Sequence, residues 1–393
     1  MSIEDALQTV AGALAPSRSR HRVSAKAGRW IVLFGRRQRP LLMPAGEYQL
    51  QKYCVPYFVG NRLKASYALL LLKLNACIPT AGLLNEIRPA PGLRGATAWG
   101  FLGTQPSCAA VQVGTSGPYQ KASALFITER GEGLALAKIA LVSSADRMVI
   151  KEARWLKELE VMGVVAREVP RLLAEGETDS GRRFLVTDVA PSTRTTRVFT
   201  SAHLHFLRRL ARSRMESMNF AASPCCEYLE RALAELNPHL ERKDMAQLED
   251  AVRDCRMRLS ACVCPFVFAQ GDFSCWNIRL NQQRLFVFDW EYAHLGANPL
   301  GDVIHYHLIE HAASGRTIDL RVIAGVNRVA QRLAQQLYPE WQWRAPEVSA
   351  LALAYILQVL LYYCQANGGR DQTDGVTRSY WLLMQRRAVW LTA

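Results

Sequence analysis

The sequence is short of acidic residues and lacks the cysteine spacings that hold metals or build disulfide frameworks. It has 34 Asp and Glu against 48 Lys and Arg, which leaves a formal net charge of +14. The ten cysteines include the adjacent pair Cys225-Cys226 and the pair Cys262-x-Cys264, but no Cys-x-x-Cys. Because a zinc site needs a second pair of ligands, we expect reduced and mostly buried thiols.

The sequence also lacks the pattern of a secretory signal and any pair of membrane spans. Its start holds Glu4 and Asp5 and has no basic segment followed by an apolar one. Only Val348 to Ala366 is uncharged and nearly long enough to span a bilayer, and it carries Ser349 and Gln358. We therefore predict a buried helix at this segment, no transmembrane segment, and a cytoplasmic protein.

The basic excess suits an anionic partner, which could be nucleic acid, a membrane surface, a nucleotide or a phosphorylated substrate. Residues 17–46 hold eight basic residues and no acid. They are Arg18, Arg20, Arg22, Lys26, Arg29, Arg36, Arg37 and Arg39. Aromatic residues do not interleave with these charges as they do in proteins that bind single strands, so we do not expect a nucleic-acid partner. The run is either a solvated face or a contact with another anion.

The pattern of apolar residues predicts a small β-rich lobe followed by a large helical lobe. Before residue 108, "RWIVLFG" and "PLLMPAG" predict a short β pair, Leu63–Leu74 a helix, and Pro89 to Gly103 a connector. From Cys108 the predicted elements are strands over 108–115, 121–128 and 134–141, a helix over 144–162, and a strand within 182–192. A helix follows near 204–210, then a helical hairpin over 226–260 broken at Asn237-Pro238. We accordingly divide the chain into an extension (1–107), an N-lobe (108–190) and a C-lobe (191–393).

Two strand-like segments each end in an aspartate. Phe266-Val267-Phe268 leads into Asp272, and Leu285 to Phe288 leads into Asp289, with Asn277 between the two aspartates. A buried carboxylate is costly unless it is paired or bound to a metal. An amide and a carboxylate oxygen at the ends of adjacent strands would suit Mg²⁺, so Asn277 and Asp289 are candidate ligands. The alternative is that both strands simply end at solvent.

These residues resemble a known family. "GDFSCWN", followed by "FDWE" and then "NPLGD", is similar to the aminoglycoside phosphotransferase/choline kinase-like family, which has a protein-kinase-like fold. The resemblance implies an α+β, two-lobe fold, ATP or GTP as cofactor, and Mg²⁺. It further implies that Asp272 is the catalytic base, that Asn277 and Asp289 are magnesium ligands, and that Asp302 braces the catalytic loop.

The first half of the chain agrees with that resemblance. Lys138 is the only charge in "LALAKIAL", and Glu152 lies fourteen residues further on in the predicted helix. A kinase-like small lobe uses such a lysine to reach the phosphates and a helix glutamate to hold it. Glu158 is the competing partner, but Glu152 lies nearer the helix start, as the family pattern has it.

The turn "GTSGPYQ" joins the first two strands of the predicted N-lobe, where a phosphate-covering loop would lie. Gly114 and Gly117 would allow close backbone approach, and Ser116 could add a hydroxyl. The full Gly-x-Gly-x-x-Gly pattern is absent, so a plain hairpin is nearly as good an interpretation. By the resemblance, Thr187, Asp188 and Val189 would form the hinge that contacts the nucleotide base.

One residue differs from the family pattern, and a group of three histidines has a spacing that partly resembles a metal site. Gln270 stands where the family usually has a histidine before Gly-Asp, which puts the bracing of the loop in question. His305, His307 and His311 follow Asp302 with partly metal-like spacing, but no Glu lies between them as in metalloproteases. We predict helix-face histidines and no metal site there.

The sequence therefore predicts an ATP- and Mg²⁺-dependent small-molecule kinase. The acceptor would be a hydroxyl of a sugar or amino alcohol, with a leaning towards bacterial carbohydrate or surface-glycan metabolism. An aminoglycoside-modifying enzyme is the nearest alternative, although cationic acceptors call for an acidic pocket. A nucleotide-binding pseudokinase scaffold is the alternative from another class. The acceptor, the choice of nucleotide and the oligomeric state stay open.

Overall fold

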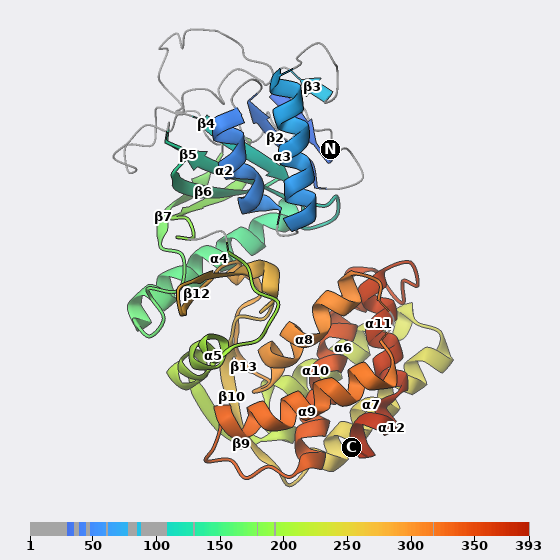
Figure 1. The fold of residues 1–393 in the computed structure, drawn as a ribbon. Helices are drawn as coiled ribbons and strands as arrows, with labels where there is room; N and C mark the ends of the chain where they lie inside the picture. Colours follow the sequence, from blue (N-terminus) through green and yellow to red (C-terminus); the bar gives the residue numbers. More distant parts are fainter. Residues whose placement is uncertain are drawn as a thin grey trace. The chain divides into compact units, whose positions relative to one another are not determined.

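The structure is a computed structural model of the 393-residue chain. It describes residues 30–34, 39–44, 48–59, 62–77, 85–87, 108–128, 130–178, 180–191, 194–316 and 318–392. The chain divides into two compact units between Thr195 and Thr196. The predicted α+β organisation, a β-rich unit followed by a mainly helical one, is confirmed (Figure 1).

The first unit is built on one antiparallel sheet. Its strands are β1 (Trp30–Leu33), β2 (Leu41–Pro44), β3 (Asn85–Ile87), β4 (Cys108–Val113), β5 (Lys121–Ile127), β6 (Gly133–Ala140), β7 (Leu172–Glu177) and β8 (Arg183–Thr187). They lie in the order β3-β1-β2-β4-β5-β6-β8-β7. The three closely spaced strands predicted from residue 108 onward are β4, β5 and β6, and each pairs with the next.

The predicted β pair and helix before residue 108 are also present. Strand β1 pairs with β2, and the predicted helix at Leu63–Leu74 is α3 (Arg62–Cys77). Strand β2 pairs in turn with β4, where Leu42 faces Val111, so one sheet runs across the proposed boundary at residue 107. The connector at 89–103 and most of the basic run lie outside the described residues.

Both faces of this sheet are buried, which explains the mixture of apolar and small residues in its strands. In β4, Ala109 and Val111 pack in one apolar cluster and Ala110 packs in another. In β5, Phe126 belongs to the first of these clusters and Leu125 to the second. Successive side chains of a strand point to opposite faces, so strands β1, β2, β4, β5 and β6 each supply both clusters. Helix α2 (Tyr48–Phe58) and α3 pack side by side on one face (Figure 1). Helix α4 (Ser143–Met162) packs against β6, β7 and β8.

The second unit consists mostly of helices. They are α5 (Ser201–Ser213), α6 (Pro224–Leu236), α7 (Arg242–Leu259), α8 (Gly301–Ala313), α9 (Leu320–Leu337), α10 (Ala345–Ala366), α11 (Gly375–Gln385) and α12 (Arg387–Thr392). The predicted break of the helical hairpin at Asn237-Pro238 is the short 3₁₀ helix η4 (Asn237–His239). Helix α10 contacts every other helix of this set except α5 closely, and it is apolar all round because it is central.

Helix α10 contains the uncharged segment Val348 to Ala366, for which the sequence predicts a buried helix. Among the described residues it is the one helix long and apolar enough to cross a bilayer, and 67% of its most apolar window is buried. Its burial comes from neighbouring helices of the second unit, which agrees with the prediction of a buried helix.

Two small sheets complete the second unit. Strand β10 (Val263–Ala269) pairs with β9 (Met215–Asn219) and β13 (His294–Ala297), and β11 (Ile278–Asn281) pairs with β12 (Arg284–Val287). Five strands were not predicted from the sequence, namely β3, β7, β9, β11 and β13. Each is at the edge of its sheet and has polar or glycine residues, so its β structure comes from pairing with a neighbour and not from local propensity.

The pairing of β2 with β4 predicts that residues before 108 stabilise the first unit. Leu42 is fully buried in the cluster shared with Val111, so Leu42→Ala should lower the free energy of unfolding by about 2–5 kcal/mol. Denaturant titration combined with hydrogen exchange at β4 and β5 would measure this. Val161→Ala, at a side chain 89% exposed in the same unit, is the control. Equal stability of the two variants would show that the extension does not support the sheet.

Candidate active site

The buried ion pair of the first unit is formed by Lys138 and Glu152, as predicted. Lys138 lies in β6 and Glu152 in α4, and the lysine Nζ is 2.7 Å from Oε1 and 2.8 Å from Oε2 of the glutamate. Their side chains are only 11% and 2% exposed. A buried ion pair contributes little net stability, but it holds both side chains in one orientation. Glu158, the competing partner, is half-buried further along the same helix.

The turn between β4 and β5 is held by backbone and side-chain bonds at its ends. The Gly114 N–H donates to the Lys121 carbonyl at 2.7 Å, and the Gln120 side-chain amide donates to the Gly114 carbonyl at 3.1 Å. Between these ends, Ser116 and Gly117 are exposed, and no atom would lie within 4 Å of a Cβ added to Gly117. The tip is therefore open, and it lies near α4, because Ser144 donates to the Pro118 carbonyl.

The segment predicted as a hinge follows β8. Thr187 is the last residue of that strand and is buried. The Asp188 carboxylate accepts hydrogen bonds from the backbone and the guanidinium Nε of Arg171, at 2.8 and 2.9 Å. Val189 packs on the cluster that contains α2 and α3. The Asp188 side chain is thus occupied by Arg171, so base recognition here would use the backbone.

The loop after β10 in the second unit is held by a buried carboxylate. Asp302, in the first turn of α8, accepts the backbone N–H of Gln270 on one oxygen and that of Gly271 on the other, both at 2.9 Å. Burial raises the pKa of Asp302, while these two N–H bonds oppose that rise. Gly271 has φ of +85°, and a Cβ there would lie 2.5 Å from the Tyr292 carbonyl oxygen. Only glycine fits this turn, and the bracing proposed for Asp302 is present.

Gln270 takes part in the same loop through its side chain. Its Oε1 accepts the Asp272 N–H at 2.9 Å, and its Nε2 donates to the carbonyl oxygens of Phe288 and Asp289, at 3.2 and 2.6 Å. The amide thus supplies both an acceptor and a donor, and it joins the loop to the end of β12. The departure from the family's histidine leaves the loop braced.

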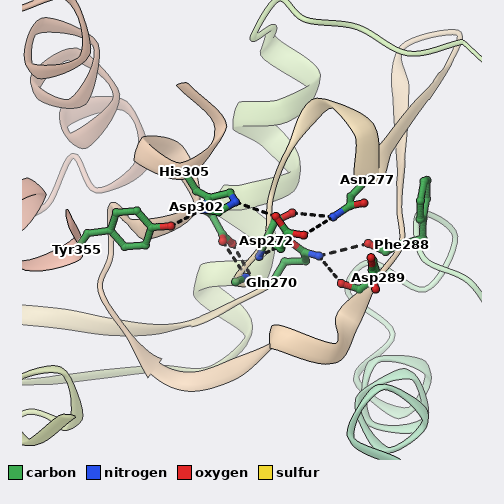
Figure 2. A network of polar contacts seen from close by, with 9 residues as sticks. Gln270, Asp272, Asn277, Phe288, Asp289, Asp302, His305 and Tyr355 are labelled. Carbon is green, nitrogen blue, oxygen red and sulfur yellow. Dashed lines mark hydrogen bonds and ion pairs between the residues drawn. The ribbon is translucent and has the colours of Figure 1, made fainter. Parts of the chain in front are cut away.

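The Asp272 carboxylate is held on both of its oxygens. His305 Nε2 lies 2.8 Å from Oδ1, and the Asn277 side-chain amide donates to Oδ2 at 2.8 Å. Figure 2 shows His305 and Asn277 approaching Asp272 from opposite sides. The other ring nitrogen of His305 bonds the Tyr355 hydroxyl, which belongs to the buried α10. When the His305 ring is neutral and carries its proton on Nε2, the Tyr355 hydroxyl donates to Nδ1 and the Nε2–H donates to Asp272.

His305 is a part of the site that the sequence did not reveal. It was predicted only as a helix-face histidine, but it is buried and its ring lies between Asp272 and Tyr355. The one available sign was its position: on a helix opened by Asp302, position 305 lies one turn further along the same face. His307 is half-buried, and burial lowers its pKa to about 4, so it stays neutral at physiological pH.

The β11–β12 hairpin brings together the ends that carry the candidate metal ligands. Ile278 faces Val287 across the hairpin, and the Phe288 N–H donates to the Asn277 carbonyl at 3.1 Å. Asn277 and Asp289 therefore flank the same end of two adjacent strands, as the sequence suggested. Asp289 has φ of 68° and ψ of 65°, a left-handed backbone conformation that residues other than glycine adopt infrequently. Its surroundings hold it there, partly through the bond from Gln270.

The donor set fits Mg²⁺. The Asn277 amide nitrogen is bonded to Asp272, so the amide oxygen points away from that carboxylate (Figure 2), and Asp289 adds a half-buried carboxylate from the same hairpin end. Magnesium prefers a small number of such oxygen ligands and retains several waters.

Comparison with known proteins identifies the family. A family model described as "phosphotransferase enzyme family" matches residues 122–347, more than half of the chain. The chain belongs to this family. With that assignment, the β-rich unit and the helical unit of the phosphotransferase are confirmed as the two lobes of a protein-kinase-like fold. A search of curated proteins found no match to this chain.

Several solved structures are similar to the phosphotransferase at low identity. An apo thermostable mutant of aminoglycoside phosphotransferase APH(4)-Ia is 15% identical, over 72% of this chain and 94% of that one, with a TM-score of 0.48. A ternary complex of another mutant of that protein with AMP-PNP and hygromycin B is 16% identical, over 71% and 94%, with a TM-score of 0.48. Choline kinase from Cryptosporidium parvum Iowa II is 12% identical, over 72% and 90%, with a TM-score of 0.49. The assignment rests on the family match and not on these likenesses.

The bonds of Gln270 predict that Gln270→Ala will loosen the loop. The substitution removes the acceptor of the Asp272 N–H and the donor to the Phe288 and Asp289 carbonyls. Because these backbone groups lose their partner, the free energy of unfolding should fall by about 1–3 kcal/mol. Thermal or denaturant unfolding would measure the loss. Gln283→Ala, at an exposed position of the β11–β12 turn, should have no effect. If both variants unfold alike, the bracing by Gln270 is wrong.

Proposed function

We propose that this phosphotransferase carries the γ-phosphate of ATP or GTP to a hydroxyl of a small molecule, with Mg²⁺ as the second cofactor. The observation that carries the proposal is the arrangement around Asp272. A carboxylate with one oxygen bonded to a buried histidine and the other to an asparagine amide has a single orientation. Each carboxylate oxygen retains a further lone pair, which could accept the proton of an acceptor hydroxyl.

Asp272 would act as the general base, and mainly as the group that orients the hydroxyl. Phosphoryl transfer needs little covalent help, so positioning and electrostatic stabilisation dominate its catalysis. The proton of the acceptor would pass to a carboxylate oxygen of Asp272. His305 and Tyr355 would hold that carboxylate without contacting the substrate themselves.

Asn277 and Asp289 would hold the metal ion. When bound, Mg²⁺ would neutralise charge on the nucleotide phosphates. Two bonds support this role. The bond from Asn277 to Asp272 orients the Asn277 amide, and the bond from Gln270 to the backbone carbonyl of Asp289 holds the backbone from which that carboxylate projects.

The first unit would bind the nucleotide. The ammonium of Lys138, held by Glu152, would contact the phosphates. The exposed turn with Gly114, Ser116 and Gly117 would cover them with backbone N–H groups. The segment Thr187 to Val189 would contact the base through its backbone, since Arg171 already occupies the Asp188 carboxylate.

The surroundings of Asp272 favour a sugar or an amino alcohol as the acceptor. Three half-buried tyrosines follow one another in ring contact: Tyr292 lies 5.9 Å from Tyr362, and Tyr362 lies 5.7 Å from Tyr363, measured between ring centroids. Burial raises the pKa values of Tyr292 and Tyr363, with Asp272 as a further cause, so these hydroxyls stay neutral. Aromatic faces suit the apolar side of a sugar ring or a small organic cation. An enzyme of this kind would act in the cytoplasm, where its nucleotide is available.

The test of the proposal is nucleotide-dependent turnover. The purified chain would be assayed with ATP or GTP and Mg²⁺ against a panel of sugars, aminoglycosides and amino alcohols, with release of ADP or GDP as the readout. Turnover with a sugar or amino alcohol is expected. Turnover confined to aminoglycosides would favour the alternative acceptor class, and nucleotide binding without any turnover would contradict the proposal of an enzyme.

Asp272→Asn tests the base. The substitution keeps the size of the side chain but removes its capacity to take a proton, so turnover should fall by about 10²-fold or more. Nucleotide affinity, measured by calorimetry, should change little, because the substitution leaves Lys138 and Asp289 in place. Asp250→Asn, at an exposed carboxylate of α7, is the control and should retain full turnover. Unchanged turnover in Asp272→Asn would remove this residue from the mechanism.

Asp289→Asn tests the metal site with a readout other than activity. Wild type should gain thermal stability when ATP is added with Mg²⁺, compared with ATP alone. Without the Asp289 charge, most of that magnesium-dependent gain should disappear while the melting temperature of the unliganded protein stays close to wild type. A gain equal to that of wild type would contradict the assignment of Asp289 as a ligand.

A further inference from the structure

The outer side of α3 carries an apolar stripe. Tyr67, Leu70 and Leu74 are 62%, 53% and 40% exposed, and their spacing of three and four residues places them on one side of the helix. Ala65, Ala68 and Leu72 are buried against the sheet on the opposite side. Large apolar side chains that are exposed together often mark an interaction site. We call Tyr67, Leu70 and Leu74 the α3 stripe.

Lysines flank the α3 stripe on both sides. At 3.6 residues per turn, Lys64 and Lys73 lie about a quarter turn to either side of the stripe. Both are exposed. Neither α2 nor α3 contains an aspartate or a glutamate. On the neighbouring α2, the ammonium of Lys52 lies 5.1 Å from the ring centroid of the 43% exposed Tyr53.

The charge of the sequence around these helices has the same sign. Residues 6–85 contain twelve Lys and Arg and a single acid, Glu47. Most of the formal net charge of +14 therefore comes from this fifth of the chain. These residues also precede position 122, where the family match begins.

We propose that the α3 stripe and its flanking lysines dock the chain on an anionic phospholipid surface. An interfacial helix places apolar side chains among the acyl chains and lysines at the level of the head groups, which is the order seen across α3. The stripe extends over about 10 Å of the helix and projects outward opposite the buried side, so it suits a flat surface. A second copy of the chain would bring like charges together, and nucleic acid would not require the apolar residues.

The test is co-sedimentation of the full-length protein with vesicles. Wild type should bind vesicles of phosphatidylglycerol and phosphatidylcholine, bind vesicles of phosphatidylcholine alone much more weakly, and dissociate as salt is raised. Leu70→Gln/Leu74→Gln should weaken binding roughly 10-fold or more, because the apolar contribution is lost. Lys64→Gln and Lys73→Gln should each weaken it about fivefold.

Matched controls separate the surface from general effects. Val161→Gln, at an exposed apolar residue of α4, and Lys243→Gln, at an exposed lysine of α7, should bind as wild type does. Tyr67→Ser, at the most exposed residue of the stripe, replaces the double variant if that variant does not fold. Because the readout is vesicle binding, a failure here is distinct from a failure of the proposed phosphoryl transfer.

Three outcomes would overturn the proposal. The first is no binding of wild type to anionic vesicles. The second is equal binding by wild type and the stripe variants, which would leave charge alone as the cause. The third is a wild-type dimer that the stripe substitutions convert to a monomer in sedimentation velocity, which would identify a second copy of the chain as the occupant.

Discussion

The geometry of the candidate active site depends on one buried carboxylate. Asp302 accepts two backbone N–H groups, from Gln270 and Gly271, and this fixes the turn that follows β10. The same first two turns of α8 carry His305, which holds the Asp272 side chain. One helix therefore determines both the path of the loop and the direction of its carboxylate. Desolvation makes an ionised aspartate costly here, and the two N–H bonds are the compensation.

A glutamine at position 270 is compatible with this geometry because an amide can donate and accept at once. Its oxygen takes the Asp272 N–H, and its nitrogen reaches the backbone after β12. The loop after β10 and the β11–β12 hairpin, whose ends carry Asn277 and Asp289, are thereby tied together. Each candidate residue of the second unit is bonded to another or to the backbone beside it, which limits the reorganisation that binding of a metal or substrate would require.

The first unit combines a buried ion pair in its interior with an exposed apolar and basic side. Its interior holds the Lys138–Glu152 pair on the part of the chain that matches the family. Strands β1 to β3 and helices α2 and α3 come before the matched range, yet they extend the same sheet and pack on it. Because this addition contributes to the core, it also has an outer side. On that side, the described helices α2 and α3 carry exposed apolar side chains and lysines and contain no Asp or Glu. Docking on a membrane through the α3 stripe would involve none of the candidate site residues.

Local patterns in the sequence determined the helices and strands that have strong apolar periodicity. They also determined the charged residues that stand out because their sequence neighbours are apolar. A single lysine in an apolar strand and aspartates at strand ends predicted Lys138, Asp272 and Asp289 as candidates, and the Lys138–Glu152 contact is confirmed. Tertiary structure decided what depends on distant segments. Strand β7 exists because β8 pairs with it, and the extension belongs to the sheet because β2 pairs with β4. His305 became part of the site because helix packing places its ring between Asp272 and Tyr355, residues separated from it by 33 and 50 positions. Such contacts depend on the whole fold, and no local pattern encodes them.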